Sequence, residues 1–378
     1  MIYKQFCDLK LSALGFGCMR LPTVNGQNAD IDEKETARLI ARAMEDGVNY
    51  YDTAWGYHDG NSETVVGRIL KQYPRDSFFL ATKFPGYDLS NMDKVEEIFN
   101  RQLEKCQVEY FDFYLFHNIC EMNIDAYLDP QYHIYESLMA RKKAGQIRHL
   151  GFSAHGNLET MKRFLDAYGK DMEFCQIQLN WLDWEFQDAK AKVDLLNQWD
   201  IPVWVMEPLR GGRLTKLSEE ESARLRTLRP EEHVPAWAFR FIQSLPSVGV
   251  TLSGMSAMEQ VEDNLNTFST EKPLSHGEME ALLKIARDMT AKTSVPCTAC
   301  RYCTTHCPQG LDIPDLLELY NEFTFTGGGF IAPMRVGRMP AGKKPNACIG
   351  CRSCEAVCPQ QIKISEALAA FSAGLKLS

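Results

Sequence analysis

The stretch Leu14-Gly15-Phe16-Gly17-Cys18 decides between two folds for the first 270 residues of this 378-residue chain. A doubly wound sheet that binds a dinucleotide places G-x-G-x-x-G directly after its first strand, at the start of a helix. Here the third glycine is missing, and Pro22 follows shortly afterwards. The stretch therefore predicts a strand of a closed barrel rather than a phosphate-binding turn.

Outward from this stretch, short apolar runs alternate with amphipathic segments, the pattern of repeated β-α units. The predicted strands are Leu14–Gly17, Tyr50–Asp52, Phe78–Lys83, Phe111–Phe116, His149–Phe152, Phe174–Leu179, Pro202–Val205 and Val248–Leu252. The predicted helices are Asp32–Asp46, Ser62–Gln72, Asp93–Cys106, Tyr132–Lys143, Leu158–Tyr168, Gln187–Gln198, Pro235–Gln243 and Ser256–Thr267. Eight strand–helix units over about 250 residues predict an α/β fold of the (β/α)8, or TIM barrel, type.

The length of the chain exceeds what one hydrophobic core usually serves, so we expect a second domain. The predicted organisation is a barrel over residues 1–270, a helical linker over 271–294 and a small domain over 295–378. Within the last part, Asp315–Tyr320 is predicted to be helical and Thr326–Gly329 to be a loop. The long segment from Pro308 to Ala347 favours a mainly α-helical, ferredoxin-like domain over a compact β-rich one.

Eight of the 13 cysteines crowd into this small domain, in two sets of four. Each set reads C-x2-C-x2-C-x3-C-P, in which three thiolates bind one [4Fe-4S] cluster and the fourth, before proline, binds the other. Structural zinc sites usually show paired C-x2-C knuckles instead. The spacing predicts two [4Fe-4S] clusters, one on Cys297, Cys300, Cys303 and Cys358, the other on Cys348, Cys351, Cys354 and Cys307.

The remaining five cysteines are scattered, as inert thiols of a cytoplasmic protein usually are. The net charge of −9 argues against nucleic acid and anionic membrane as partners. The opening residues Met1–Asp8 do not resemble a targeting signal, and the longest apolar runs, such as Ile201–Met206, are too short to span a bilayer. We therefore expect a cytoplasmic protein without a membrane partner.

Polar residues mark the ends of successive predicted barrel strands, where barrel enzymes carry their chemistry. Asp52, Lys83 and His117 follow this pattern, and Tyr57 lies in the loop after the second strand. Reduction of a carbonyl by hydride leaves an alkoxide that needs a proton. A buried lysine favours the phenolate of a nearby tyrosine and so makes it a better acid. Asp52 would orient Lys83, and His117 would fix the carbonyl oxygen.

These motifs make the sequence similar to the aldo-keto reductases over residues 1–270. The resemblance rests on Asp52-Thr53-Ala54 with Tyr57, on Ala81-Thr82-Lys83, on Tyr114-Leu115-Phe116-His117, and on Ile147-Arg148-x2-Gly151-x-Ser153. The whole chain resembles the subgroup with a fused C-terminal 4Fe-4S dicluster domain of the ferredoxin type. The resemblance implies a nicotinamide cofactor, NAD(P)H, and a catalytic tetrad of Asp52, Tyr57, Lys83 and His117.

The resemblance also implies a path for the cofactor across the barrel mouth. Nicotinamide contacts are expected from Ser153, Gln176 and the segment 206–212, with Asn180 nearby, and adenosine contacts from the segment 253–264. The implied residues are Ser153, Gln176, Met206, Pro208, Leu209, Gly211, Ser253, Gly254, Gln260 and Asn264. His58 and His155 are expected to flank the pocket as polar residues.

Three positions depart from the family pattern. Met206 stands where a tyrosine often stacks on nicotinamide, and Ala154 where an asparagine often follows the serine. Met255 and Gln260 are uncharged, whereas a 2′-phosphate normally recruits Arg or Lys. Arg213 and Lys216 lie close enough in sequence to supply such a charge, so the choice between NADH and NADPH stays open.

The sequence thus predicts an NAD(P)H-linked oxidoreductase acting on a small carbonyl or alcohol substrate. Its two clusters would exchange single electrons with a partner protein or with the substrate. Nicotinamide moves hydride whereas a cluster moves one electron, and no flavin site that would bridge the two is evident. Two alternatives remain: a carbonyl reductase whose clusters are structural or sense oxygen, and a nicotinamide-sensing subunit without turnover of its own.

Overall fold

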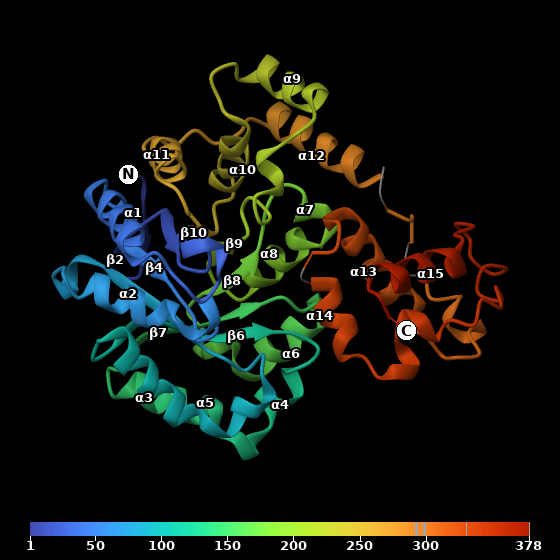
Figure 1. Ribbon diagram of the computed structural model, residues 1–378, viewed down its shortest axis with the longest axis horizontal. Coiled ribbons are helices and arrows are strands. Elements are labelled where there is room, and N and C mark those ends of the chain that lie inside the picture. The colour runs from blue at the N-terminus through green and yellow to red at the C-terminus, as the bar shows by residue number, and fades with distance from the viewer. Residues whose placement is uncertain (292–293, 298–299, 330, 378) are drawn as a thin grey trace. The chain divides into compact units, whose positions relative to one another are not determined.

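The computed structural model divides the chain into two compact units, Met1–Leu282 and Leu283–Ser378 (Figure 1). The structure describes residues 1–291, 294–297, 300–329 and 331–377. Residues 292–293 of the predicted linker, and residues 298–299, 330 and 378 of the predicted small domain, lie outside the described residues.

The first unit is built on eight parallel strands that close into a barrel in the order β10-β3-β4-β5-β6-β7-β8-β9. The strands are β3 Leu14–Gly17, β4 Tyr50–Asp52, β5 Phe79–Phe84, β6 Phe111–Ile119, β7 Ile147–Ala154, β8 Cys175–Gln178, β9 Val203–Met206 and β10 Val248–Ser253. All eight predicted strands are among them. The (β/α)8 barrel is therefore confirmed.

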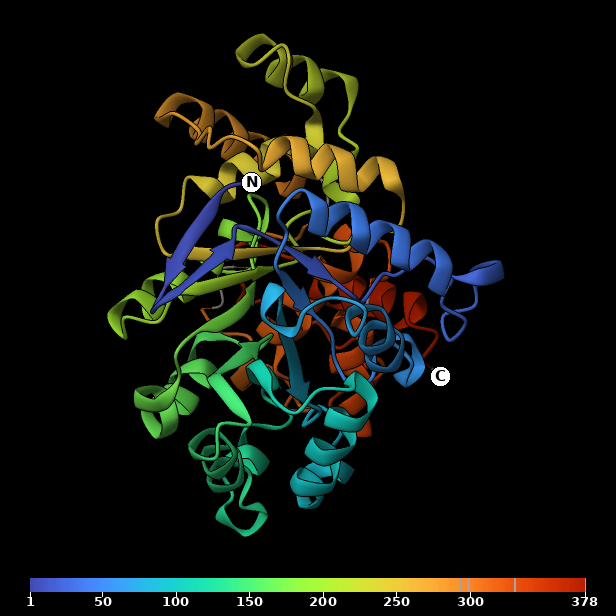
Figure 2. The ribbon, with the colours of Figure 1, turned by 90° about the vertical axis from the view of Figure 1, so that its left-hand side faces the viewer.

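Helices surround these strands, and each predicted helix has a counterpart (Figures 1 and 2). The helix after the first barrel strand starts where predicted, because the Asp32 side chain accepts a hydrogen bond from the Glu35 N–H. The helices are α1 Glu33–Glu45, α2 Ser62–Leu70, α3 Val95–Cys106, α5 Ile134–Lys143, α6 Leu158–Tyr168, α8 Ala189–Gln198, α10 Val234–Gln243 and α11 Met258–Thr267.

Several elements in the loops escaped the prediction. Most of them are short, and periodicity is weak over one or two turns, but the helix Glu219–Leu228 has 10 residues and was missed as well. The additional helices are α4 Ile124–Leu128, α7 Asp183–Phe186 and α9 Glu219–Leu228. The 3-10 helices are Val24–Gly26, Tyr57–Gly60, Arg75–Ser77, Leu89–Lys94, Pro130–Tyr132, Gly169–Asp171, Arg213–Thr215, Thr304–His306, Ala341–Lys343 and Pro345–Ala347.

An antiparallel hairpin, β1 Tyr3–Phe6 and β2 Leu9–Ser12, precedes the barrel and was not predicted (Figure 2, beside the N-terminus). The Phe6 ring centroid lies 5.0 Å from that of Trp204 and 5.7 Å from that of Phe113, near the beginnings of their strands. The hairpin therefore closes the N-terminal end of the barrel, and the C-terminal ends of the strands stay available for a site.

The second unit is mainly helical, as predicted. Helix α12, His276–Ala291, contains the boundary between the units, and it is followed by α13 Ile313–Thr326, α14 Ile331–Arg338 and α15 Ile364–Gly374. The prediction made α13 too short and missed α14 and α15. Asp312 caps α13, which runs on to Thr326 before Gly327, with φ 63°, ends it.

Two apolar clusters hold this unit together. The first surrounds the cysteines and contains Leu311, Ile313, Leu316, Leu317, Ile362, Ile364 and Leu368 together with Cys303 and Cys354. The second contains Leu319, Ala332, Val336 and Phe371. Among the residues that the structure describes, no helix is both long enough and apolar enough to cross a membrane.

Candidate functional site

Four predicted residues meet at the C-terminal side of the barrel. Asp52 ends β4, Lys83 lies near the end of β5, His117 lies in β6, and Tyr57 begins a 3-10 helix after β4. The Lys83 ammonium donates to Asp52 Oδ1 at 2.6 Å and lies 3.5 Å from the Tyr57 hydroxyl. Both Lys83 and Asp52 are buried. Parallel pairing of β4 with β5 and of β5 with β6 brings these side chains together.

Burial and charge act in opposite directions on this group. Burial disfavours the charged form of Lys83, but Asp52 and Tyr57 outweigh it and raise the lysine pKa. Burial raises the pKa of Tyr57 above its usual value, and the nearby charge of Lys83 partly offsets this rise. The lysine is therefore charged and the phenol is protonated at neutral pH, which leaves a proton available at the Tyr57 oxygen.

His117 forms the wall beside the phenol. Its ring centroid lies 6.2 Å from that of Tyr57 and 5.1 Å from that of Tyr87, and its backbone oxygen accepts a hydrogen bond from Tyr127. Burial, followed by the charge of Lys83, lowers the His117 pKa well below its usual value. A neutral imidazole results, and its Nδ1 has no hydrogen-bond partner among the described residues.

Predicted nicotinamide contacts lie on the neighbouring strands. Ser153 pairs with Gln176 across β7 and β8, and both are buried. Gln176 Oε1 has no hydrogen-bond partner in the described part of the chain, while its Nε2 lies 3.8 Å from Met206 Sδ. A buried amide oxygen without a hydrogen-bond partner can accept a hydrogen bond from a bound ligand. These side chains fit the carboxamide of nicotinamide, which brings both donors and an acceptor.

Asn118 is a polar neighbour that the sequence did not reveal. Its backbone N–H donates to Ser153 Oγ at 2.8 Å, and its own side-chain oxygen is buried without a hydrogen-bond partner among the described residues. Its φ of 61° places it in the left-handed region, where asparagine is tolerated better than most residues. Asn118 thus lies beside Ser153 and supplies a side-chain amide near Ala154, the position at which the family often has an asparagine.

Asn180 is used by the protein itself. Its amide donates to Asp183 Oδ2 and to the Glu207 backbone oxygen, and its own oxygen accepts from the N–H groups of Leu182 and Asp183. Arg210 donates from Nε to the same Asp183 carboxylate. This network ties the loop after β9, which contains buried Pro208 as well as Leu209, Gly211 and Gly212, to the loop after β8.

The residues predicted for the adenosine end form two hydrogen-bonded pairs. Ser253 Oγ accepts from the Asn264 amide at 3.0 Å, and Gln260 Oε1 accepts from the Ser256 N–H at 2.8 Å. Gly254 lies between them and is exposed. Met255 is fully buried and Gln260 is engaged with the backbone, so this end presents no cation from these two positions.

Arg20 is a second residue that the sequence analysis missed. Its guanidinium lies 3.5 Å from Glu207 Oε1, and a Cβ on Gly211 or Gly254 would lie 3.2 Å or 3.1 Å from Arg20 atoms. Arg20 thus lies beside both loops of the predicted cofactor path. It follows the first barrel strand with no motif around it, so only the closed barrel, which places β3 beside β10, shows its position.

The two predicted flanking histidines differ. His58 is buried, and both ring nitrogens bond to backbone, Nε2 to the Leu21 N–H and Nδ1 to the Asn28 oxygen. It fastens a loop and has no ring nitrogen left for a ligand. His155 follows β7, and burial lowers its pKa to about 4, so its imidazole is neutral.

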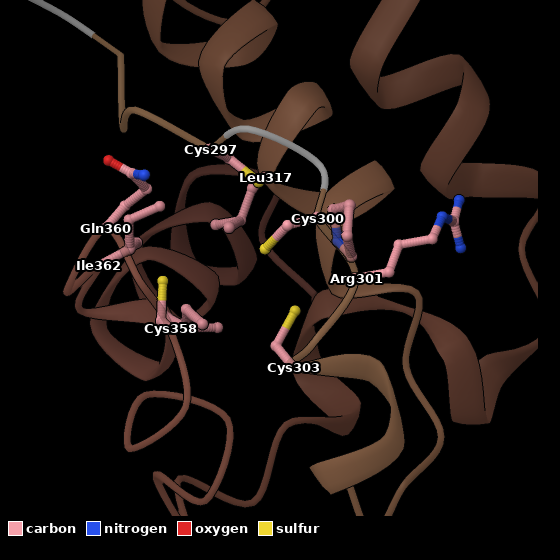
Figure 3. A pocket seen from close by; sticks show the side chains of 10 residues that line it. Cys297, Cys300, Arg301, Cys303, Leu317, Cys358, Gln360 and Ile362 are labelled. Carbon is pink, nitrogen blue, oxygen red and sulfur yellow. The ribbon is translucent and has the colours of Figure 1, made fainter.

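The structure brings the eight clustered cysteines together in the predicted sets of four. One cavity is lined by Cys297, Cys300, Cys303 and Cys358, whose sulfurs surround a common space in Figure 3. Another is lined by Cys307, Cys348, Cys351 and Cys354. Among the residues that the structure describes, no cysteine forms a disulfide bond. Four thiols around each apolar cavity fit the donor set of a [4Fe-4S] cluster.

A third group of metal-binding side chains, Cys7, His149 and Glu173, lies near the hairpin, with its ligand atoms within 4.8 Å of one another. His149 Nδ1 is 2.7 Å from Glu173, and Lys142 forms an ion pair with the same carboxylate. These two partners outweigh burial and lower the Glu173 pKa. The carboxylate charge is therefore already compensated, and the group is an ion-pair network.

The family model described as "Aldo/keto reductase family" matches residues 13–287. The chain belongs to the aldo/keto reductase family. A second model, described as "4Fe-4S dicluster domain", matches residues 296–363, so this aldo/keto reductase carries an iron–sulfur domain after its barrel. The predicted oxidoreductase class and the fused dicluster domain are both confirmed.

Relatives and solved structures resemble the barrel portion. The chain is 26% identical to the NADH-specific methylglyoxal reductase of Escherichia coli (strain K12) over 55% of this chain and 67% of that protein. It is 26% identical to the L-galactose dehydrogenase of Arabidopsis thaliana, over 75% and 93%. The structure of the aldo-keto reductase AKR11C1 from Bacillus halodurans (holo form) matches with a TM-score of 0.62 at 27% identity, over 75% and 96%.

A Klebsiella pneumoniae aldo-keto reductase in complex with NADPH matches with a TM-score of 0.61 at 19% identity, over 76% of this chain and 96% of that chain, and shows the shared fold.

Proposed function

We propose that this protein reduces a small carbonyl compound, or oxidises the corresponding alcohol, with NAD(P)H as the hydride carrier. The observation that carries the proposal is the buried Lys83, which contacts Asp52 and the Tyr57 hydroxyl at once. When bound, the nicotinamide supplies hydride to the carbonyl carbon. The protein supplies the proton and the orientation.

In this proposal, Tyr57 gives the proton to the carbonyl oxygen during reduction. Lys83 lowers the cost of forming the phenolate, because its charge lies 3.5 Å from the phenol oxygen. Asp52 and the Thr53 backbone oxygen, which accepts from Lys83 at 2.8 Å, hold the ammonium in place. The phenol is then reprotonated from solvent, which reaches the partly exposed Tyr57.

His117 and Tyr87 would orient the substrate. The neutral imidazole can donate one N–H to the carbonyl oxygen without adding a charge that would compete with Lys83. The Tyr87 ring, packed edge-on against His117, forms an aromatic wall on the side of the loop after β5. An aromatic wall favours substrates with an apolar part next to the carbonyl group.

The buried oxygens of Gln176 and Asn118, which have no hydrogen-bond partner among the described residues, indicate where the cofactor would bind. Gln176, Ser153 and Asn118 would receive the carboxamide, and Met206 would lie against the nicotinamide ring. Arg20 would face the diphosphate from beside Gly211 and Gly254. The E. coli relative is named as NADH-specific and the Klebsiella structure contains NADPH, so either dinucleotide suits this type of barrel.

The two cavities would hold one [4Fe-4S] cluster each, ligated by the two sets of cysteines that line them. These clusters would pass single electrons to or from a partner protein. Because thiolate-ligated clusters persist in reducing surroundings, we place the protein in the cytoplasm.

The test of the proposal is Tyr57→Phe, which removes only the hydroxyl. Carbonyl reduction should fall by about two to four orders of magnitude, the usual contribution of general acid catalysis. Nicotinamide affinity, measured by fluorescence, should be unchanged. Tyr3→Phe, which removes an exposed hydroxyl on the N-terminal hairpin, is the matched control. A Tyr57→Phe enzyme that keeps more than about a third of the rate would contradict this mechanism.

A further inference from the structure

The two halves of the dicluster region repeat one backbone pattern. Arg301 and Arg352 each follow the second cysteine of a motif, with φ of 62° and 60°. Gly310 and Gln361 each lie three residues after the cysteine that precedes proline, with φ of 58° and 53°. Each cavity also receives one arginine and one glutamine, in addition to its cysteines. Two clusters in such similar surroundings would have similar reduction potentials.

Charges around the arginines preserve this balance. Arg301 lies 3.2 Å from Asp312, which compensates it. Arg352 lies 3.8 Å from Glu366. Lys363, at the position that corresponds to Asp312, adds a second positive charge to that half, and Glu355, which accepts from the Ser365 N–H at 2.8 Å, adds a second carboxylate. Each arginine is thus matched by carboxylates of its own half.

Lys343 breaks the balance. It belongs to the segment between the two halves and has no counterpart in the repeat. Its ammonium donates to the backbone oxygens of Gln309 at 3.0 Å and Gly310 at 2.8 Å, directly after Cys307-Pro308. Gln309 itself lines the cavity of Cys307. A positive charge is therefore fixed beside one cavity.

The glycine in this loop admits the ammonium. A Cβ at Gly310 would lie 3.0 Å from Lys343 Nζ, closer than most side-chain carbons come to a neighbour. The corresponding residue of the other half is Gln361, which has a side chain where Gly310 has none. The next residue, Leu311, directs its N–H at Cys307 Sγ across 3.5 Å. Lysine, glycine and N–H thus gather at one ligand loop.

We propose that Lys343 makes the cluster of Cys307, Cys348, Cys351 and Cys354 the higher-potential member of the pair, so that a single electron entering the domain settles there. This inference rests on the proposed presence of both clusters. Each cluster is reduced by one electron, from [4Fe-4S]2+ to [4Fe-4S]+. A nearby cation, and a hydrogen bond to a ligand sulfur, stabilise the reduced form because it carries one more negative charge. The cluster so favoured would be the one that exchanges electrons with a partner.

The test is an anaerobic redox titration of the full, cluster-loaded chain with dithionite, followed by electron paramagnetic resonance. Lys343→Gln should lower the ratio of reduced to oxidised protein for one cluster about three- to tenfold at a fixed potential, where tenfold corresponds to 59 mV for one electron. The other cluster should not move. Lys343→Arg should keep the wild-type potentials. Cys351→Ser, which alters the spectrum of the cluster it ligates, identifies the signal.

Lys344→Gln is the matched control, because that ammonium donates to the Gly337 oxygen instead of the Cys307 loop. A shift of both clusters, of neither, or of the Cys297 cluster alone would overturn the inference. Loss of iron from Lys343→Gln, but not from Lys343→Arg, would overturn it too, by showing that the ammonium only holds the loop. Wild-type protein without clusters would refute the cluster part of the proposed function as well, whereas unchanged potentials beside normal carbonyl turnover would refute this inference alone.

Discussion

At the scale of single residues, the pocket depends on which groups accept hydrogen bonds from the three N–H groups of Lys83. The N–H groups are directed to Asp52, to the Thr53 backbone oxygen and towards Tyr57, and the lysine is fully buried. A buried ammonium without partners would lose its proton. Asp52 therefore keeps Lys83 protonated, and the charge of Lys83 in turn lowers the pKa of Tyr57. Asp52 is linked to the phenol by hydrogen bonds through the lysine.

Lys83→Met should slow carbonyl reduction about as much as Tyr57→Phe, by two to four orders of magnitude, and the two losses should not add because they disable one proton-delivery unit. Reduction requires the protonated phenol, so the rate falls as pH rises through the Tyr57 pKa. Burial raises that pKa and Lys83 lowers it. Removing the lysine should therefore move the fall to higher pH. The measurement is the pH profile of kcat.

Lys83→Met also leaves Asp52 buried without its ion-pair partner, which destabilises the fold. Lys83→Met combined with Asp52→Asn removes both charges and serves as the folded control. Additive losses of rate, or a pH profile that stays in place, would argue against a shared proton-delivery unit.

Cofactor choice also depends on single residues. Neither Met255, which is buried, nor Gln260, which accepts from the Ser256 N–H, offers a positive charge to the 2′-phosphate that distinguishes NADPH. NADH should therefore bind within about tenfold of NADPH, a difference of about 1.4 kcal/mol. Fluorescence titration with both dinucleotides measures this. Gln260→Arg should tighten NADPH alone. A thousandfold preference of the wild-type protein for NADPH would mean that another cation, such as Arg213 or Lys216, reads the phosphate.

At the scale of elements, helix packing brings the fourth cysteine of each motif to the cavity that the other motif lines. Cys307 leads into α13 and Cys358 into α15, and the first residues of these helices, Ile313 and Ile364, are buried in one apolar cluster. Each Cys-Pro turn therefore carries its cysteine to the cavity lined by the other motif. A motif cut from its partner would lack a ligand.

Cys307→Ser and Cys358→Ser should each damage the cluster bound mainly by the opposite motif. Anaerobically prepared wild-type protein should contain about eight irons, four for each cluster, with matching acid-labile sulfide. Spectra of the two variants, compared with a Cys7→Ser control at an exposed thiol outside the motifs, show which cluster is lost. Damage confined to the motif that carries the substitution would refute the exchange, and stoichiometric zinc without sulfide would refute the clusters.

At the scale of the whole molecule, the two proposed sites lie in different compact units. The four residues of the proposed proton-delivery group all lie within Met1–Leu282, and all eight clustered cysteines lie within Leu283–Ser378. Among the described residues, those of the tetrad belong to the first unit and those that line the two cavities belong to the second. A chemical step confined to one unit should not need the other.

Removing the clusters by air and chelation should therefore leave reduction of a simple aldehyde by NAD(P)H within about twofold of the loaded protein, that is, within about 0.4 kcal/mol. Circular dichroism and nicotinamide affinity are the controls for an intact barrel. If the rate falls in proportion to the iron lost, the clusters take part in turnover itself. If it does not fall, they serve exchange with a partner, sensing or structure.

The sequence by itself determined what depends on local pattern. Alternation of apolar runs and amphipathic segments identified all eight barrel strands, since strand and helix periods are written in neighbouring residues. Polar residues at strand ends identified Asp52, Lys83 and His117, because parallel strands must end at one rim. The cysteine spacing predicted both sets of four that the cavities contain, since a triple cysteine run followed by Cys-Pro suits few other sites.

Only the tertiary structure decided what depends on contacts between distant residues. The hairpin that closes the barrel, Arg20 beside Gly211 and Gly254, and the orphan oxygen of Gln176 follow from barrel closure. Lys343 reaches the loop after Cys307 across a segment with no repeat. His58 and Asn180 were expected near the ligand, but their hydrogen bonds go to the protein itself. A local sequence pattern cannot predict such partners, because most of them are far apart in the sequence and come within hydrogen-bond distance only in the folded chain.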